Sequence, residues 1–109
     1  KLFIRAKLGE ITLAVSPIIV AEAYYTMLSF YGTERKEAAA LLAQLLQQRG
    51  IKVQDRELVI TALNHLQTVN VAFVDAYLAA VAAEEKLAIA SFDRDFDKFK
   101  DVARYEPVE

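Results

Sequence analysis

The chain has 109 residues, of which 55% are hydrophobic and 26% are charged, so it is long enough for one compact domain and is not expected to be disordered. Its formal net charge of −2 argues against a protein that binds nucleic acid by a positive field alone, and the absence of cysteine excludes disulfides and thiolate metal sites. The sequence contains neither an uncharged apolar run long enough to cross a bilayer nor the apolar core of a secretory signal at residues 1–5, which favours a soluble, cytoplasmic protein.

The predicted helices and strands alternate along the chain. In order, we expect a helix over residues 1–8, a strand over 11–15, helices over 17–31 and 34–49, a strand over 51–53, helices over about 55–67 and about 73–86, a strand over 87–91 and an edge strand over 104–106. Ser16 is a favourable N-cap before a proline, Asp55 can cap the fourth helix, and Gly9, Gly32 and Gly50 are natural helix stops. The alternation predicts one α/β domain over residues 1–109, with a mostly parallel sheet and with ligands at the carboxyl ends of its strands.

Glu22 is the first unusual acid. It is the only Asp, Glu, Lys or Arg between Glu10 and Glu34, and it lies in a predicted helix that is otherwise mostly apolar. Because burial of an unpaired carboxylate is costly, Glu22 must reach solvent, pair with a cation or bind a metal ion. An exposed stripe on the helix explains it as well as a metal does, but its position in the first turns after a strand favours function.

Asp75 is isolated in the same way. It is the only Asp, Glu, Lys or Arg between Glu57 and Glu84, and it stands where a mostly buried helix is predicted to start. Aspartate is among the best N-cap residues, so capping is one interpretation. Metal binding is the other, and the two roles are compatible.

Asp93 comes just after the predicted strand over residues 87–91, at the edge of the sheet where α/β active sites assemble. Asp95 and Asp97 crowd the same turn. Considered alone, the turn is equally well explained by solvated aspartates that cap the short helix beyond it.

Together, acids at the starts of two helices and at the end of a strand can converge on a hard, oxygen-liking cation such as Mg²⁺ or Mn²⁺. The sequence offers little for other chemistries, since it has no cysteine, no glycine-rich phosphate loop and a single histidine, His65, in the middle of a predicted helix. Because the chain is net acidic, any chemistry on nucleic acid would need such metal ions as its positive charge.

Three segments resemble those that bear the acidic residues of the PIN domain family, and within it of the VapC-type toxins of bacterial and archaeal toxin–antitoxin pairs. They are residues 16–22 (SPIIVAE), 73–80 (FVDAYLAA) and 87–96 (LAIASFDRDF), and the resemblance extends over essentially the whole chain. It implies a three-layer α/β fold with a mostly parallel central sheet flanked by helices. It also implies the site residues: Glu22, Asp75 and Asp93 as catalytic, metal-binding carboxylates, Asp95 as a further metal ligand, and Ser91 and Asp97 as accessory residues.

The resemblance implies a function as well: a divalent-metal-dependent endoribonuclease that uses Mg²⁺ or Mn²⁺ to hydrolyse RNA. Its expected partners are the RNA substrate, a cognate antitoxin protein and a second copy of the chain in a homodimer. Arg94 and Lys98 follow the acidic turn and are candidates for contact with the RNA backbone, although a solvated charged face explains them equally well.

One departure from the family pattern concerns the N-terminus. Family members begin with a central strand that carries an aspartate, followed by a helix that corresponds to residues 1–8, and neither that strand nor its acid is present here. Loss of a central strand would expose two strand edges and remove a metal ligand. We therefore expect an active parent nuclease and a 109-residue chain that is inactive or much weakened. Missing upstream residues, a cleaved chain or completion by a partner would each account for the departure.

A non-enzymatic module is the competing interpretation. It would be a degenerate PIN-like domain that binds an antitoxin or dimerises through the apolar helices over residues 17–31 and 34–49. The missing first acid favours this module, whereas Glu22, Asp75 and Asp93 favour the enzyme. An α/β phosphotransfer domain that uses its acids for Mg²⁺ is more distant, because no phosphoacceptor or nucleotide motif is evident.

Overall fold

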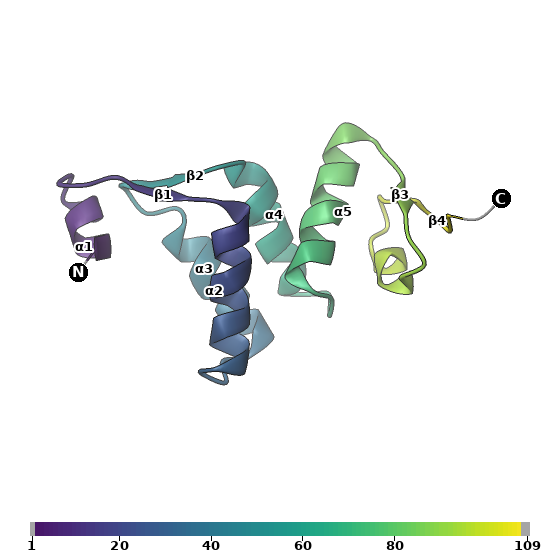
Figure 1. The fold of residues 1–109 in the computed structure, drawn as a ribbon, viewed down its shortest axis with the longest axis horizontal. Coiled ribbons are helices and arrows are strands. Elements are labelled where there is room, and N and C mark those ends of the chain that lie inside the picture. Colours follow the sequence, from purple (N-terminus) through teal and green to yellow (C-terminus); the bar gives the residue numbers. More distant parts are fainter. Residues whose placement is uncertain (1, 108–109) are drawn as a thin grey trace.

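The computed structural model describes residues 2–107, so Lys1 of the first predicted helix lies outside the described residues. The helices are α1 (Leu2–Lys7), α2 (Pro17–Ser29), α3 (Arg35–Leu45), α4 (Arg56–Leu66), α5 (Phe73–Glu85) and the 3-10 helix η1 (Arg94–Lys98), and the strands are β1 (Leu13–Val15), β2 (Ile51–Val53), β3 (Ile89–Ala90) and β4 (Arg104–Tyr105) (Figure 1). The predicted α/β fold with parallel strands is therefore confirmed. Among the described residues, none of these helices is long and apolar enough to cross a membrane.

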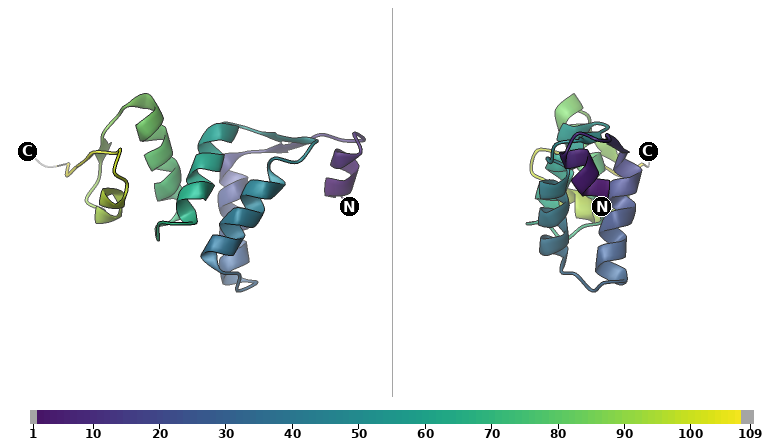
Figure 2. Two further views of the ribbon diagram at one scale, coloured as in Figure 1. Left: turned by 180° about the vertical axis from the view of Figure 1, so that it is seen from behind. Right: turned by 90° about the vertical axis from the view of Figure 1, so that its left-hand side faces the viewer.

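The four strands form two separate two-stranded sheets, both parallel. Leu13 of β1 pairs with Ile51 of β2, and Ile89 of β3 pairs with Arg104 of β4. Figures 1 and 2 show the β1–β2 sheet towards the end of the molecule that carries α1 and the β3–β4 sheet towards the other end, with α4 and α5 between them. Within residues 2–107 no strand joins the two sheets, and the molecule is elongated, with extents of 54 × 30 × 19 Å.

The core lies where α4 packs against α3 and α5. Small side chains on α4 and α5, such as Ala62 and Ala76, are fully buried and let the two helices approach closely. Leu63 and Leu66 are also fully buried on α4, and burial of each such side chain contributes about 1.5–3 kcal/mol to stability. This helical core supports the first turn of α5, which carries Asp75.

The local signals at α2 and α4 had different outcomes. Ser16 caps α2 as predicted, because its side chain accepts a hydrogen bond from the backbone N–H of Ile19. Asp55 occupies the N-cap position of α4, as predicted, but it has a left-handed backbone, with φ of 53°, and its side chain makes no capping hydrogen bond. Its carboxylate instead accepts a long hydrogen bond, 3.5 Å, from the hydroxyl of Tyr77 on α5.

Several predicted boundaries are too wide. Helix α3 ends at Leu45 rather than near residue 49, because Gln47 and Gln48 donate to carbonyls three residues back and so turn more tightly than an α-helix. Gly50 follows with φ of +86°, and a side chain there would overlap the carbonyl group of Ala6 against which it packs. The strand predicted over residues 11–15 is reduced to three residues that are half-buried or exposed, and the one over 87–91 to two.

Candidate metal centre

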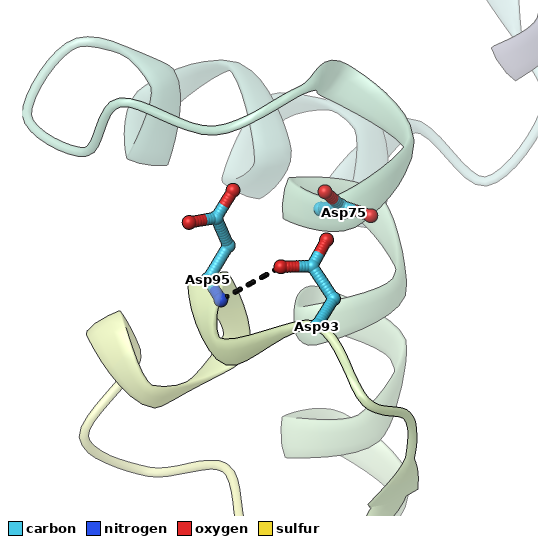
Figure 3. Close-up of side chains that lie close together, drawn as sticks. All are labelled: Asp75, Asp93 and Asp95. Carbon is cyan, nitrogen blue, oxygen red and sulfur yellow. Dashed lines mark hydrogen bonds between the residues drawn. The ribbon is translucent and has the colours of Figure 1, made fainter.

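Three aspartates meet where the first turn of α5 faces the turn between β3 and η1. Carboxylate oxygens of Asp75, Asp93 and Asp95, one from each residue, lie within 4.8 Å of one another. Figure 3 shows Asp75 on α5 opposite Asp93 and Asp95, which come from the turn and from η1. We call these residues the acidic trio. Asp93 is exposed, whereas Asp75 and Asp95 are partly buried.

Asp75 is placed by the start of α5. The N-cap of this helix is Ala72, so the interpretation of Asp75 as an N-cap is wrong, and the residue instead lies in the first helical turn. The positive end of the helix dipole favours a carboxylate at that position. Phe73 anchors the same turn, because its buried ring packs against Tyr24 and stacks on Tyr77, with ring centroids 6.4 and 6.1 Å apart.

Asp93 and Asp95 are placed by a hydrogen-bonded turn. The backbone N–H of Asp93 donates to Ser91 Oγ at 3.0 Å, and that of Asp95 donates to Asp93 Oδ1 at 2.9 Å. Asp93 is thus the N-cap of η1, as the capping interpretation of this turn predicted. Because the cap uses Oδ1, the second oxygen of Asp93 stays available to a ligand, and capping is compatible with metal binding.

The trio concentrates negative charge. Burial, and after it the charges of Asp93 and Asp95, raise the pKa of Asp75 above its ordinary value of 3.8. One cation lies beside the trio: the Lys98 ammonium is 3.1 Å from Asp95 Oδ1 and donates to the carbonyl of Asn70 at 3.0 Å. The donors of the trio are carboxylate oxygens, the ligands that hard cations such as Mg²⁺ and Mn²⁺ prefer, so these residues fit such an ion.

The raised pKa of Asp75 leads to a prediction about the metal-free protein. A carboxyl whose pKa is raised by folding stabilises the fold fully below its unfolded pKa, and this contribution is lost as the pH rises through the folded pKa. We therefore expect Asp75→Asn to change the thermal midpoint little at pH 3, where the carboxyl is neutral in both states, and to raise it at pH 7. Melting curves in EDTA at both pH values test this, and a lower midpoint for the variant at pH 7 would contradict it.

The remaining predicted site residues lie outside the trio. Glu22 is exposed on α2 and is not part of the group of described carboxylates that are close enough to hold one ion. Asp97 is engaged elsewhere: Arg104 donates to both of its oxygens, at 2.9 and 3.1 Å, and these bonds hold the pKa of Asp97 below its ordinary value. Arg94 is exposed at the start of η1.

Two contributors to this region were not among the predicted site residues. Arg104 was expected only as part of an edge strand, yet it binds the turn that carries Asp93 and Asp95. The backbone carbonyl of Asn70 accepts a hydrogen bond from the ammonium group of Lys98. The Asn70 contact joins residues 28 positions apart and the Arg104 contacts join residues 7 and 13 positions apart, and no local pattern around either residue indicated them.

Comparison with known proteins adds a family relationship. The PIN domain family matches residues 2–102, a range that contains every member of the acidic trio. Neither the curated proteins nor the solved structures compared with the chain gave a match.

Proposed function

The chain belongs to the PIN domain family, whose members are generally nucleases, and on this basis we propose that it is the nuclease domain of a divalent-metal-dependent endoribonuclease of the VapC toxin type. The observation that carries the proposal is the acidic trio, in which oxygens from two separate segments lie within 4.8 Å of one another. The reaction is hydrolysis of an RNA phosphodiester bond. Glu22 is proposed as a further ligand from α2, which packs against α5.

In this proposal Asp75, Asp93 and Asp95 hold Mg²⁺ or Mn²⁺. Such an ion, when bound, lowers the pKa of a water molecule and offsets negative charge on the phosphate and the leaving oxygen. The side chains of the protein supply the rest: the carboxylates orient the ligands, and Ser91 Oγ fixes the backbone at Asp93 by accepting its N–H. Arg94 is an exposed contact for the RNA backbone, and Lys98 offsets part of the charge of Asp95.

We further propose that an extended segment from outside residues 1–109 lies between β1 and β3 and brings another acid to the site. Two features support it. The sheets are separate, and the backbone N–H groups of Ala14 and Ala90 lie on the edges of β1 and β3 opposite their paired strands. On this view the 109-residue chain has little activity alone.

A cleavage assay tests the proposal. A mixture of single-stranded and structured RNAs is incubated with the 109-residue chain, and in parallel with the longest polypeptide that its gene encodes, in Mg²⁺, Mn²⁺ or EDTA. We expect cleavage by the longer polypeptide with either metal, none in EDTA and none for Asp75→Asn. Full Mg²⁺-dependent activity of the 109 residues, abolished by Asp75→Asn, would contradict the need for a further strand.

The proposed partners besides RNA are an antitoxin protein and a second copy of the chain, in the cytoplasm. An open, mostly apolar groove of about 300 Å³ between α1 and α3 supports a protein partner. Its lining includes Ile4, Leu41 and Leu45, and an amphipathic helix docks in such a groove through apolar anchors. Co-purification of an antitoxin with the wild-type chain, and its loss in Leu41→Glu, would support this assignment.

The second candidate function is an inactive PIN-like module that only binds such a partner. It is favoured by the position of Glu22 outside the acidic trio and by the two unjoined sheets. Binding of Mn²⁺ separates the two candidates, because an interaction module has no need of it. Antitoxin binding without Mn²⁺ binding by either polypeptide would favour the module.

A further inference from the structure

Arg104 makes an unusual set of contacts for a residue on an edge strand. Its guanidinium donates to both carboxylate oxygens of Asp97, at 2.9 and 3.1 Å, and to the backbone carbonyl of Ser91 at 3.1 Å. Its side chain is only 12% exposed, whereas that of Asp97 is 54% exposed. A single side chain from β4 therefore binds both the residue that follows β3 and the last part of η1.

The two groups that Arg104 binds, the carbonyl of Ser91 and the carboxylate of Asp97, lie on either side of Asp93 and Asp95 in the sequence. Ser91 precedes Asp93, and Asp97 follows Asp95, so the segment with both trio members runs between two points held by the same guanidinium. We propose that Arg104 is a positioning residue of the metal centre, which closes this segment into a loop and holds Asp93 and Asp95 opposite Asp75. The inference rests on the proposed function, because it assigns Arg104 a role at the same site.

Arginine suits this role for a geometric reason. Its planar fork presents parallel N–H groups to a carboxylate while a third N–H points elsewhere, and a lysine ammonium cannot satisfy both ends at once in this fixed arrangement. The contacts also reach the trio through the backbone: Ser91 Oγ receives the N–H of Asp93, whose carboxylate receives the N–H of Asp95. Greater backbone mobility at Ser91 would therefore be transmitted through these hydrogen bonds to Asp93 and Asp95.

The test uses variants that keep the net charge. Arg104→Lys removes the planar fork and Asp97→Glu displaces the carboxylate by one methylene, so each disturbs the two-point contact without changing the charge near the trio. Glu106→Asp is the matched control, because Glu106 pairs with Arg104 only at 3.6 Å. Affinity for Mn²⁺ is measured from the electron paramagnetic resonance signal of the free ion. We expect about tenfold weaker binding in the first two variants, as for loss of residues that orient metal ligands, and wild-type binding in the control.

Amide hydrogen exchange separates positioning from general destabilisation. In Arg104→Lys and Asp97→Glu we expect the amides of Asp93 and Asp95 to exchange faster, while the buried amides of α4 keep their wild-type rates. Wild-type Mn²⁺ affinity in both variants would overturn the role of Arg104 alone. Equal acceleration of exchange throughout α4 and the turn would also overturn it, since the residue would then only stabilise the fold. No Mn²⁺ binding by the wild-type chain would contradict the metal centre itself, and this role with it.

Discussion

Replacing Asp93 with asparagine is expected to weaken Mn²⁺ binding by more than ~100-fold, because even residues that only orient metal ligands contribute 10–100-fold. Asparagine is nearly isosteric and keeps an oxygen that can accept the N–H of Asp95, so the cap of η1 is preserved. What the substitution removes is one negative charge from a group of three carboxylates within 4.8 Å. The substitution should therefore lower the affinity for Mn²⁺ without lowering the free energy of unfolding.

The same titration should include Asp101→Asn as a control. Asp101 is an exposed aspartate in the same part of the chain, outside the trio, so its neutralisation changes the net charge equally without removing a ligand. In EDTA the free energy of unfolding of both variants should lie no more than about 0.5 kcal/mol below that of the wild-type chain. Equal weakening of Mn²⁺ binding by both substitutions would mean that the trio attracts the ion only through its general field.

Two acids of the candidate site, Asp75 and Asp93, could be singled out from their local sequence, whereas Asp95 lies in a crowded acidic turn and did not stand out by itself. Asp75 is isolated in a long apolar stretch, and Asp93 comes just after an apolar run that ends a strand, so the sequence alone indicates both. The carboxylates of these residues come together because α5 lies beside the turn after β3. The alternation of helices and strands predicted an α/β fold but not this particular contact. The family match over residues 2–102 agrees with the resemblance of these same segments.

Other features could not be predicted, because they depend on contacts between distant segments. The bond from Lys98 to the carbonyl of Asn70 spans 28 residues, and the position of Arg104 follows from the pairing of β4 with β3. The missing capping hydrogen bond of Asp55 has a related reason. The partner of its carboxylate, Tyr77, lies on another helix, and the sequence around Asp55 gave no sign of that contact.

A strand added between β1 and β3 would join the two sheets, and we expect it to have a large effect on Mn²⁺ binding. In the ladder between β1 and β2, Leu13 donates to Gly50 and Val15 accepts from Gln54, so the N–H of Ala14 points to the opposite edge. In the other sheet Ile89 donates to Ala103, just before β4, and Ser91 donates to Tyr105, which leaves the N–H of Ala90 on the opposite edge in the same way. An added strand can therefore accept from both edges.

We expect a polypeptide that supplies the proposed segment, compared with the 109-residue chain, to protect the amides of Ala14 and Ala90 from hydrogen exchange and to bind Mn²⁺ at least about 10–100-fold more tightly, because in the proposal that segment contributes a carboxylate. Protection at these two amides reports the joined sheet, and the gain in affinity reports the added acid, so the effects can be separated. Replacement of the acid in the added strand by asparagine should abolish the gain in affinity and leave the protection. Equal exchange at Ala14 and Ala90 in both polypeptides would mean that the sheets stay apart and that the acidic trio acts without a further strand.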